Sequence, residues 1–204
     1  MQLAANVLAH AALAEGRDVQ LFGSYGGMMR GGNTDAELVV ADDRIEAPPT
    51  VGSAWAVLLL HPDYADPVLA RVRQGGLVLR NAVVWVGPLE RGDVDVVDVA
   101  ATDLAAEVGH VMAASMVMLG ALCTVTGLVE LDAVQVAARA CVPPYRRQHL
   151  ELNDRALKAG AAAVVRSSAI EAPALGVCLD ANQSRSRHAR ATGSGRRDRS
   201  TGLP

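Results

Sequence analysis

Cysteine is scarce in this chain of 204 residues, and its three cysteines lie far apart. Cys123, Cys141 and Cys178 form no pair with the short spacing of a metal-ligand motif or a disulfide framework. The spacing favours buried or incidental thiols. An iron–sulfur cluster held by this chain alone is excluded, because such a cluster needs a full set of cysteine ligands. We therefore expect no metal site.

Aromatic residues and long apolar runs are also few. Only 3% of the residues are aromatic while 50% are hydrophobic, so the core must be aliphatic. The longest apolar run, Val111 to Val125, is shorter than the roughly 20 residues of a membrane span, and we expect a buried helix there. The N-terminus lacks the basic region of a signal peptide. We expect a cytoplasmic protein without membrane contact.

A glycine-rich loop with one arginine is present, running SYGGMMRGGNT from Ser24 to Thr34. Its bare backbone amides suit an anion-binding concavity, and the guanidinium of Arg30 offers a planar fork for carboxylate or phosphate. The same glycines equally suit a tight connection between two strands, with Arg30 in solvent. The residues alone leave both interpretations open. We identify no general acid–base pair and no nucleophile, so no catalytic residue is expected.

Strands and helices are expected to alternate along the chain. The patterns predict helices at 3–15, 63–73, 103–108, 111–125, 131–141 and 145–159, and strands at 18–22, 35–41, 54–60, 77–79, 83–86 and 94–99. Gly75–Gly76 indicates a turn, and Thr102 is a candidate N-cap. His61 either acts as a base or closes the strand before it. The alternation predicts an α/β fold with a mostly parallel sheet and helices on both faces.

The composition changes after about residue 163. Residues 164–204 carry seven arginines and three acids, whereas residues 1–163 carry a net charge of −7. We expect one α/β domain over 1–163, and a basic, disordered tail over 164–204 that has little to bury. Without an aromatic platform or a folded basic face, no nucleic-acid partner is expected.

The segment GSYGGMMRGGNTDAELVVADDRIEAP resembles the gamma subunit, or gamma domain, of 2-oxoacid:ferredoxin oxidoreductases of the pyruvate, 2-oxoglutarate or ketoisovalerate type. The matching residues are Tyr25, Gly26, Arg30, Gly31, Gly32, Ile45 and Pro48, and later Gly75, Gly76, Asn81, Thr102, Ala105, Gly109, Leu119, Gly120, Gly127, Asn153, Ala156 and Gly160. The chain departs from the family at Gly27 and Met28, where Pro-Glu is usual, and at Ser115, where asparagine is usual.

The resemblance implies a Rossmann-like, three-layer fold that lacks its first strand, because the family's first strand and Gly-rich loop precede the point where this sequence begins. It implies an accessory subunit of a cytoplasmic hetero-oligomer that oxidatively decarboxylates a 2-oxoacid to an acyl-CoA, with electrons passing to ferredoxin. Thiamine diphosphate and iron–sulfur clusters would then lie in the alpha, beta and, where present, delta subunits. The contact with ferredoxin would be indirect, and the isolated chain would be inactive.

The resemblance also assigns a role to the loop. Its residues would face a subunit interface near the active site or coenzyme A, with Arg30 as an anion contact or interface anchor; they are Tyr25, Gly26, Arg30, Gly31, Gly32 and Asn33. The alternative is a non-catalytic α/β scaffold or a degenerate remnant of that subunit. The missing first strand, Met28, Ser115 and the basic tail, which has no counterpart in the family, favour this alternative.

Overall fold

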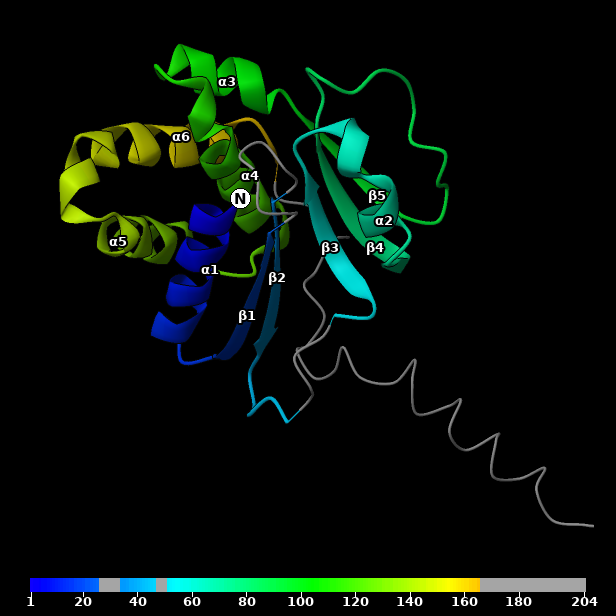
Figure 1. Ribbon diagram of the computed structural model, residues 1–204, viewed down its shortest axis with the longest axis horizontal. Helices are drawn as coiled ribbons and strands as arrows, with labels where there is room; N and C mark the ends of the chain where they lie inside the picture. The colour runs from blue at the N-terminus through cyan, green and yellow to red at the C-terminus, as the bar shows by residue number, and fades with distance from the viewer. Residues whose placement is uncertain (26–33, 47–50, 166–204) are drawn as a thin grey trace, which may run out of the picture.

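The computed structural model describes residues 1–25, 34–46 and 51–165 (Figure 1). In chain order the elements are α1 (Gln2–Ala14), β1 (Asp18–Tyr25), β2 (Thr34–Ala41), β3 (Ala54–Leu59), η1 (Pro62–Tyr64), α2 (Asp66–Leu69), β4 (Val72–Asn81), β5 (Asp95–Val99), α3 (Ala101–Glu107), η2 (Val111–Ala113), α4 (Ala114–Thr126), α5 (Leu131–Cys141), η3 (Pro144–His149) and α6 (Leu150–Ala162), where η marks a 3₁₀ helix. The predicted basic tail falls almost entirely outside the described residues.

The strands form two separate sheets within the described residues. β3, β4 and β5 make a parallel sheet in that order, and β1 pairs with β2 in an antiparallel hairpin. The α/β class is confirmed, but the expectation of one mostly parallel sheet holds for three of the five strands. The difference has a simple cause, because only residues 26–33 connect β1 to β2. A parallel pair needs a crossover of about a dozen residues or more, so a shorter connection leaves neighbouring strands antiparallel.

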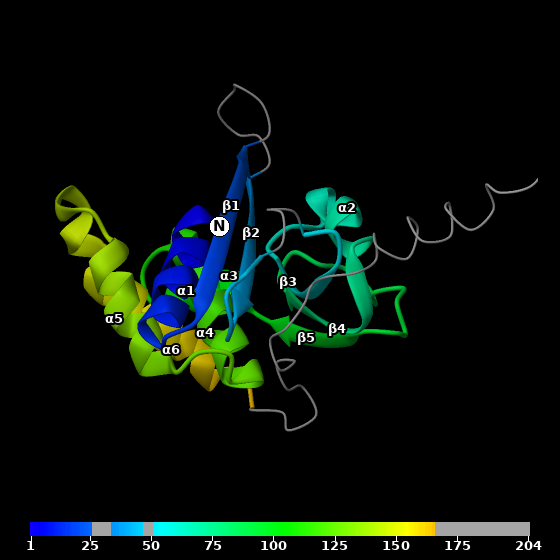
Figure 2. The same cartoon turned by 90° about the horizontal axis from the view of Figure 1, so that it is seen from below.

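Within the parallel sheet, the central strand β4 is buried on both faces from residue 76 to residue 81. Leu77 and Leu79 of β4 enter the main core, which they share with α1, α3, α4, α5 and α6. Val78, between them, points the other way and joins Val57 and Leu59 in a smaller core. Figures 1 and 2 show the helical bundle on one side of this sheet, and the short α2 on the other.

Three local predictions were wrong around β4. The helix expected at 63–73 is reduced to η1 and α2, and β4 begins already at Val72. Gly75 and Gly76 lie inside β4, where Ala54 pairs with Val72 but Ala56 pairs with Leu77, so the glycines accommodate a bulge instead of ending the strand. Gly75 has a φ of +69°, which glycine adopts without strain. The strand expected at 83–86 is a turn and loop segment.

The helices α4 and α6 cross in direct backbone contact. A Cβ atom on Gly120 would overlap the carbonyl oxygen of Leu157, and a Cβ on Gly160 would overlap that of Val117. Each glycine therefore permits the close approach of the opposite helix. This crossing holds α6 on the core.

The helix α4 is buried on nearly every side. Met116 and Met118 are buried in the main core, whereas Met112 in η2 is 81% exposed. Among the described residues, no helix has the length and apolar character needed to cross a bilayer.

Candidate functional site

The glycine-rich loop leaves from the end of the β1–β2 hairpin. The last strand pair joins Tyr25 to Thr34, and the side-chain amide of Gln2 donates to the carbonyl oxygen of Asp35 at 2.8 Å. The loop therefore begins and ends beside the first turn of α1, near the label N in Figure 1. Of the predicted site residues, Tyr25 lies at the end of β1. The others lie outside the described residues, namely Gly26, Arg30, Gly31, Gly32 and Asn33.

The opposite end of the hairpin is fixed by polar contacts. The carboxylate of Asp18 accepts hydrogen bonds from the backbone N–H of Val19 at 3.1 Å and of Ile45 at 2.7 Å. Arg17, just before β1, donates to the carbonyl oxygen of Leu128, in the loop between α4 and α5. Because both ends of the hairpin are held, the strands present the loop from a fixed position.

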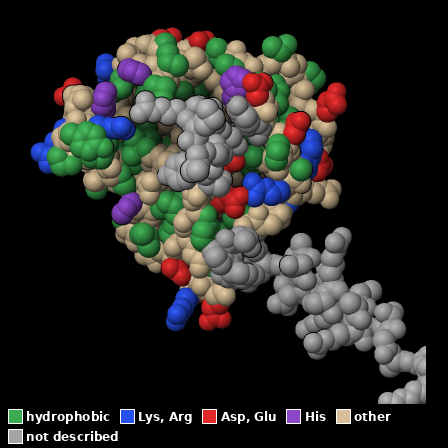
Figure 3. Space-filling view, viewed as in Figure 1, with side chains coloured by type: hydrophobic (Ala, Val, Ile, Leu, Met, Phe, Trp, Pro, Cys, Tyr) green, Lys and Arg blue, Asp and Glu red, His purple; other side chains and the backbone are tan. Residues whose placement is uncertain are grey.

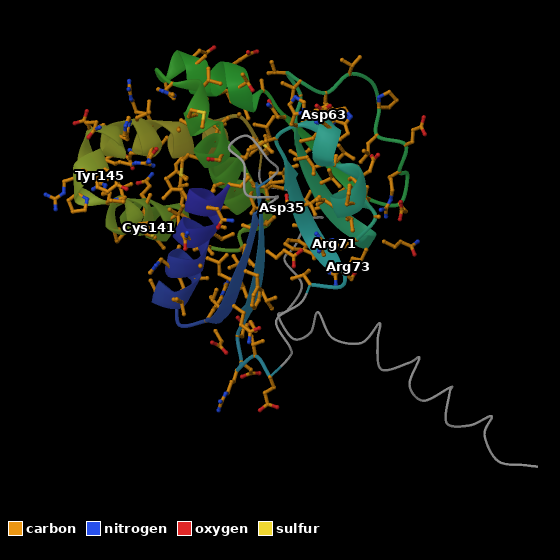
Figure 4. All side chains as sticks on the ribbon, viewed as in Figure 1. Asp35, Asp63, Arg71, Arg73, Cys141 and Tyr145 are labelled. Carbon is orange, nitrogen blue, oxygen red and sulfur yellow. The ribbon has the colours of Figure 1, made fainter. Side chains whose placement is uncertain are left out.

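An arginine joins the two sheets. Arg71, immediately before β4, forms an ion pair with Glu37 of β2 and also donates to the carbonyl oxygen of Val51 at 3.3 Å. Figure 4 labels Arg71 at the parallel sheet. Its charge is engaged in a structural contact, so Arg71 is not a free anion site.

The carboxyl edge of the parallel sheet is where open α/β sheets usually bind ligands. Here the edge is closed by Asn81, which is 2% exposed. Its amide nitrogen donates to the Thr102 hydroxyl at 2.7 Å and to the Leu60 carbonyl at 3.4 Å, and its oxygen accepts from the Thr102 N–H at 3.3 Å. Asn81 therefore ties the ends of β3 and β4 to the start of α3. Thr102 lies inside α3 instead of capping it, so that prediction was wrong.

The contacts of the His61 imidazole distinguish a catalytic base from a residue that closes the strand before it. Its Nδ1 accepts a hydrogen bond from the backbone N–H of Asp63 at 3.3 Å, and so caps η1 at the end of β3. The same nitrogen lies 3.5 Å from the Asp63 carboxylate. These contacts favour a polar residue that closes the strand.

Sequence reasoning missed a charged cluster on the outer face of the parallel sheet. Arg80 is only 9% exposed and forms a two-pronged ion pair with Asp98, its partner in register on β5. It also donates to the Gly87 carbonyl at 2.9 Å and lies 5.7 Å from the ring centroid of Trp85. The hydrogen bonds to Asp98 raise the pKa of Arg80. One arginine in an otherwise apolar run was the available signal, since a buried charge needs a partner.

Arg91 makes the second contact that holds residues 82–94 over this face. Its guanidinium donates to the carbonyl oxygens of Leu69 at 2.8 Å and Val72 at 3.1 Å, and pairs with Asp93. Hydrogen bonding from Arg91 lowers the pKa of Asp93. The guanidinium groups of Arg80 and Arg91 are therefore engaged in contacts that stabilise the fold rather than bind a ligand.

The described cysteines do not fit an iron–sulfur cluster. Burial in α4 raises the pKa of the Cys123 thiol to about 12, and burial also raises the pKa of Cys141 at the end of α5. A metal ligand must be a thiolate, which both environments disfavour. Within residues 1–25, 34–46 and 51–165, no three His, Cys, Asp or Glu side chains are grouped so that they could hold a metal ion. Cys178 lies outside these residues.

The residues shared with the oxidoreductase gamma subunits fall largely in the core. Asn153, Ala156 and Gly160 are buried along α6, and Leu119 and Gly120 are buried in α4. These matches therefore report on the packing of the helices, whereas the matched residues of the loop between β1 and β2 lie outside the described residues.

Comparison with known proteins gives consistent matches. The family model described as pyruvate ferredoxin/flavodoxin oxidoreductase matches residues 1–163. The chain is 33% identical over 144 residues to the pyruvate/ketoisovalerate oxidoreductases common subunit gamma of Thermococcus kodakarensis, covering 67% of this chain and 77% of that protein. It is 32% identical over 150 residues to the 2-oxoglutarate synthase subunit KorC of Methanothermobacter thermautotrophicus, covering 71% and 78%.

Solved structures agree. The gamma subunit of a keto/oxoacid ferredoxin oxidoreductase from Geobacter sulfurreducens superimposes with a TM-score of 0.65 at 28% identity, over 78% of this chain and 88% of that one. The pyruvate oxidoreductase subunit PORC of Thermotoga maritima gives a TM-score of 0.60 at 28% identity, over 78% and 87%.

Proposed function

Because the chain belongs to the pyruvate ferredoxin/flavodoxin oxidoreductase family, as a gamma subunit of a 2-oxoacid:ferredoxin oxidoreductase, we propose that its task is to dock on and complete the subunits that carry the cofactors. Those partners are alpha, beta and, where present, delta subunits. They hold thiamine diphosphate for the carbanion chemistry and iron–sulfur clusters for the electrons. The donor set of this chain supports that division, since burial raises the thiol pKa of both described cysteines, of which Cys123 is fully and Cys141 partly buried.

The proposal assigns the interface to the loop from Tyr25 to Asn33. The observation that supports this assignment is that the β1–β2 hairpin is held at both ends. Tyr25 pairs with Thr34 at one end, and contacts of Asp18 and Arg17 fix the other end. A loop held this way starts from one position, which lowers the entropy lost on binding. The loop then faces the partner subunits near their active site or coenzyme A.

We propose that Arg30 is the residue of this loop that binds an anion at the interface. Four glycines at 26, 27, 31 and 32 flank it, so few neighbouring side chains can pack on its stem. The guanidinium therefore contributes through its planar fork, by a bidentate pair with a phosphate of coenzyme A or with a carboxylate across the interface. Backbone N–H groups of the glycines supply further donors to the same anion.

We place the hairpin and the parallel sheet in the middle of a Rossmann-like, three-layer arrangement. The ion pair between Arg71 and Glu37, which joins the sheets, supports this placement.

Purification of the tagged full chain from its own cells tests the function. We expect subunits with bound thiamine diphosphate and iron–sulfur clusters in the same particle, and reduction of ferredoxin or a viologen dye that depends on both a 2-oxoacid and coenzyme A. A chain recovered free of such subunits, in a fraction without that activity, would instead support the scaffold or remnant alternative.

A further inference from the structure

The corner between α5 and α6 exposes an aromatic ring among arginines. This η3 corner is the segment Pro144–His149. Tyr145 is 73% exposed, and the guanidinium of Arg146 lies 5.6 Å from the centre of its ring. Arg147 is exposed beside them. Figure 4 labels Tyr145 at the far left of the molecule, where Figure 3 shows blue basic and green apolar side chains together.

Charge is distributed unevenly between this region and the rest of the domain. Residues 139–158 carry five basic and two acidic side chains, a net charge of +3. Residues 1–138 carry seven basic and seventeen acidic side chains, a net charge of −10. The η3 corner is therefore the centre of a basic region on an acidic domain.

Only part of this positive charge is used within the chain. Asp154 of α6 pairs with Lys158 at 3.1 Å and with Arg139 at 3.7 Å. No carboxylate of the described residues lies within ion-pair distance of Arg146 or Arg147. The two arginines and the tyrosine thus remain available to a partner.

An exposed tyrosine stacked with arginine gains little for the folded chain, whereas tyrosine and arginine are enriched among residues that dominate binding at protein interfaces. We propose that the η3 corner docks on an acidic surface of a partner subunit, with Tyr145 as the buried anchor and Arg146 and Arg147 pairing with carboxylates. This inference rests on the proposed function, because the partner is a subunit of the same complex. It assigns a second contact, separate from the loop at Tyr25–Asn33.

Charge favours an acidic protein surface over a nucleic acid. A polynucleotide extends its negative charge far beyond three side chains, so it would also meet the acidic body of the domain, with its net charge of −10 over residues 1–138. A folded partner can present carboxylates to the corner alone. Arginine forks suit such carboxylates by bidentate hydrogen bonds.

A matched pair of charge reversals in the full chain tests the inference. The double variant R146E/R147E is compared with R44E/R73E, which makes the same change of charge at two other exposed arginines, one after β2 and one in β4. Binding to the purified cofactor-bearing subunits is measured at physiological salt, and thermal unfolding is measured for each variant. We expect R146E/R147E to bind at least about tenfold more weakly and R44E/R73E to bind like the natural chain.

Two further variants separate contact from charge and from misfolding. Tyr145→Ala should weaken binding about tenfold, while Tyr145→Phe retains most of it, because the ring is the anchor. R146Q/R147Q, which removes charge without reversing it, should weaken binding less than R146E/R147E and flatten its dependence on salt.

Equal binding by R146E/R147E and the natural chain would overturn the inference while leaving the proposed function intact. Equal losses in R146E/R147E and R44E/R73E would also overturn it, since the effect would then be nonspecific charge. If single-stranded DNA or RNA binds the natural chain at the same salt and competes with the subunits, the corner is a nucleic-acid site instead. A natural chain that binds no cofactor-bearing subunit would contradict the proposed function itself.

Discussion

Buried polar side chains join segments of the chain that are distant in sequence. Asn81 is the main case, because one amide group contacts the end of β3 and both the backbone and the hydroxyl of Thr102. Asn81 and Thr102 each match the family pattern, but sequence alone did not show that they bind one another. The ion pair between Arg80 and Asp98 was likewise hidden, since the two residues meet only through the parallel register of β4 and β5.

Replacing Asn81 tests this connection. Asn81→Leu keeps the branched shape and the number of side-chain heavy atoms but removes every hydrogen bond, leaving the Thr102 N–H and hydroxyl without this partner in a buried place. We expect a loss of about 2 kcal/mol in the free energy of unfolding, measured by urea denaturation. Asn6→Ala is the control, because exposed Asn6 bonds only to a carbonyl of its own helix and should change stability by less than about 0.5 kcal/mol. Similar small effects for both variants would show that Asn81 does not hold the edge.

Helices and strands were predictable where the pattern is local. The helix at 131–141 was predicted with the bounds that the structure has, because its apolar residues repeat at helical spacing. The start of β4 was missed, since Gly75–Gly76 has the appearance of a turn and joins a strand only through pairing with β3. That pairing depends on contacts far apart in sequence, and the local pattern does not contain them. The antiparallel hairpin of β1 and β2 was predictable, by contrast, because residues 26–33 are too few for the crossover that a parallel pair needs.

The crossing of α4 and α6 tolerates little increase in side-chain size at its two glycines. Gly120→Ala and Gly160→Ala each place a methyl group against the backbone of the opposite helix. We expect each to lower the free energy of unfolding by about 3 kcal/mol, as overpacking against backbone cannot be relieved by a rotamer change.

Gly92→Ala provides the matched control, because no atom lies within 4 Å of a Cβ built there. Chemical denaturation followed by circular dichroism compares the three variants. If Gly120→Ala and Gly160→Ala are as stable as Gly92→Ala, the helices do not cross in backbone contact.

At the scale of the whole molecule, the two small sheets share one core but carry no further strand on their outer edges within the described residues. Unpaired strand edges are templates for pairing with other chains. We therefore expect the chain expressed without partner subunits to form concentration-dependent oligomers in light scattering after gel filtration. A monomer that stays monodisperse as its concentration rises would contradict this expectation.

The glycine-rich loop is the part of the account on which the proposed function depends most. The sequence supplied its candidate residues, and the structure supplied the clamped hairpin from which the loop leaves. The position of Arg30 itself lies outside the described residues, so its role stays a proposal that binding experiments must test.

The most direct measurement is the affinity of the chain for its cofactor-bearing subunits, with and without the arginine fork. Arg30→Ala should weaken binding by about 2 kcal/mol, roughly thirtyfold, while the thermal stability of the isolated chain stays unchanged. Arg30→Lys should recover only part of this loss, because an ammonium group cannot form the bidentate pair. Unchanged affinity of Arg30→Ala, or unfolding of the chain with full activity per folded molecule, would contradict the account and make the loop a structural connection.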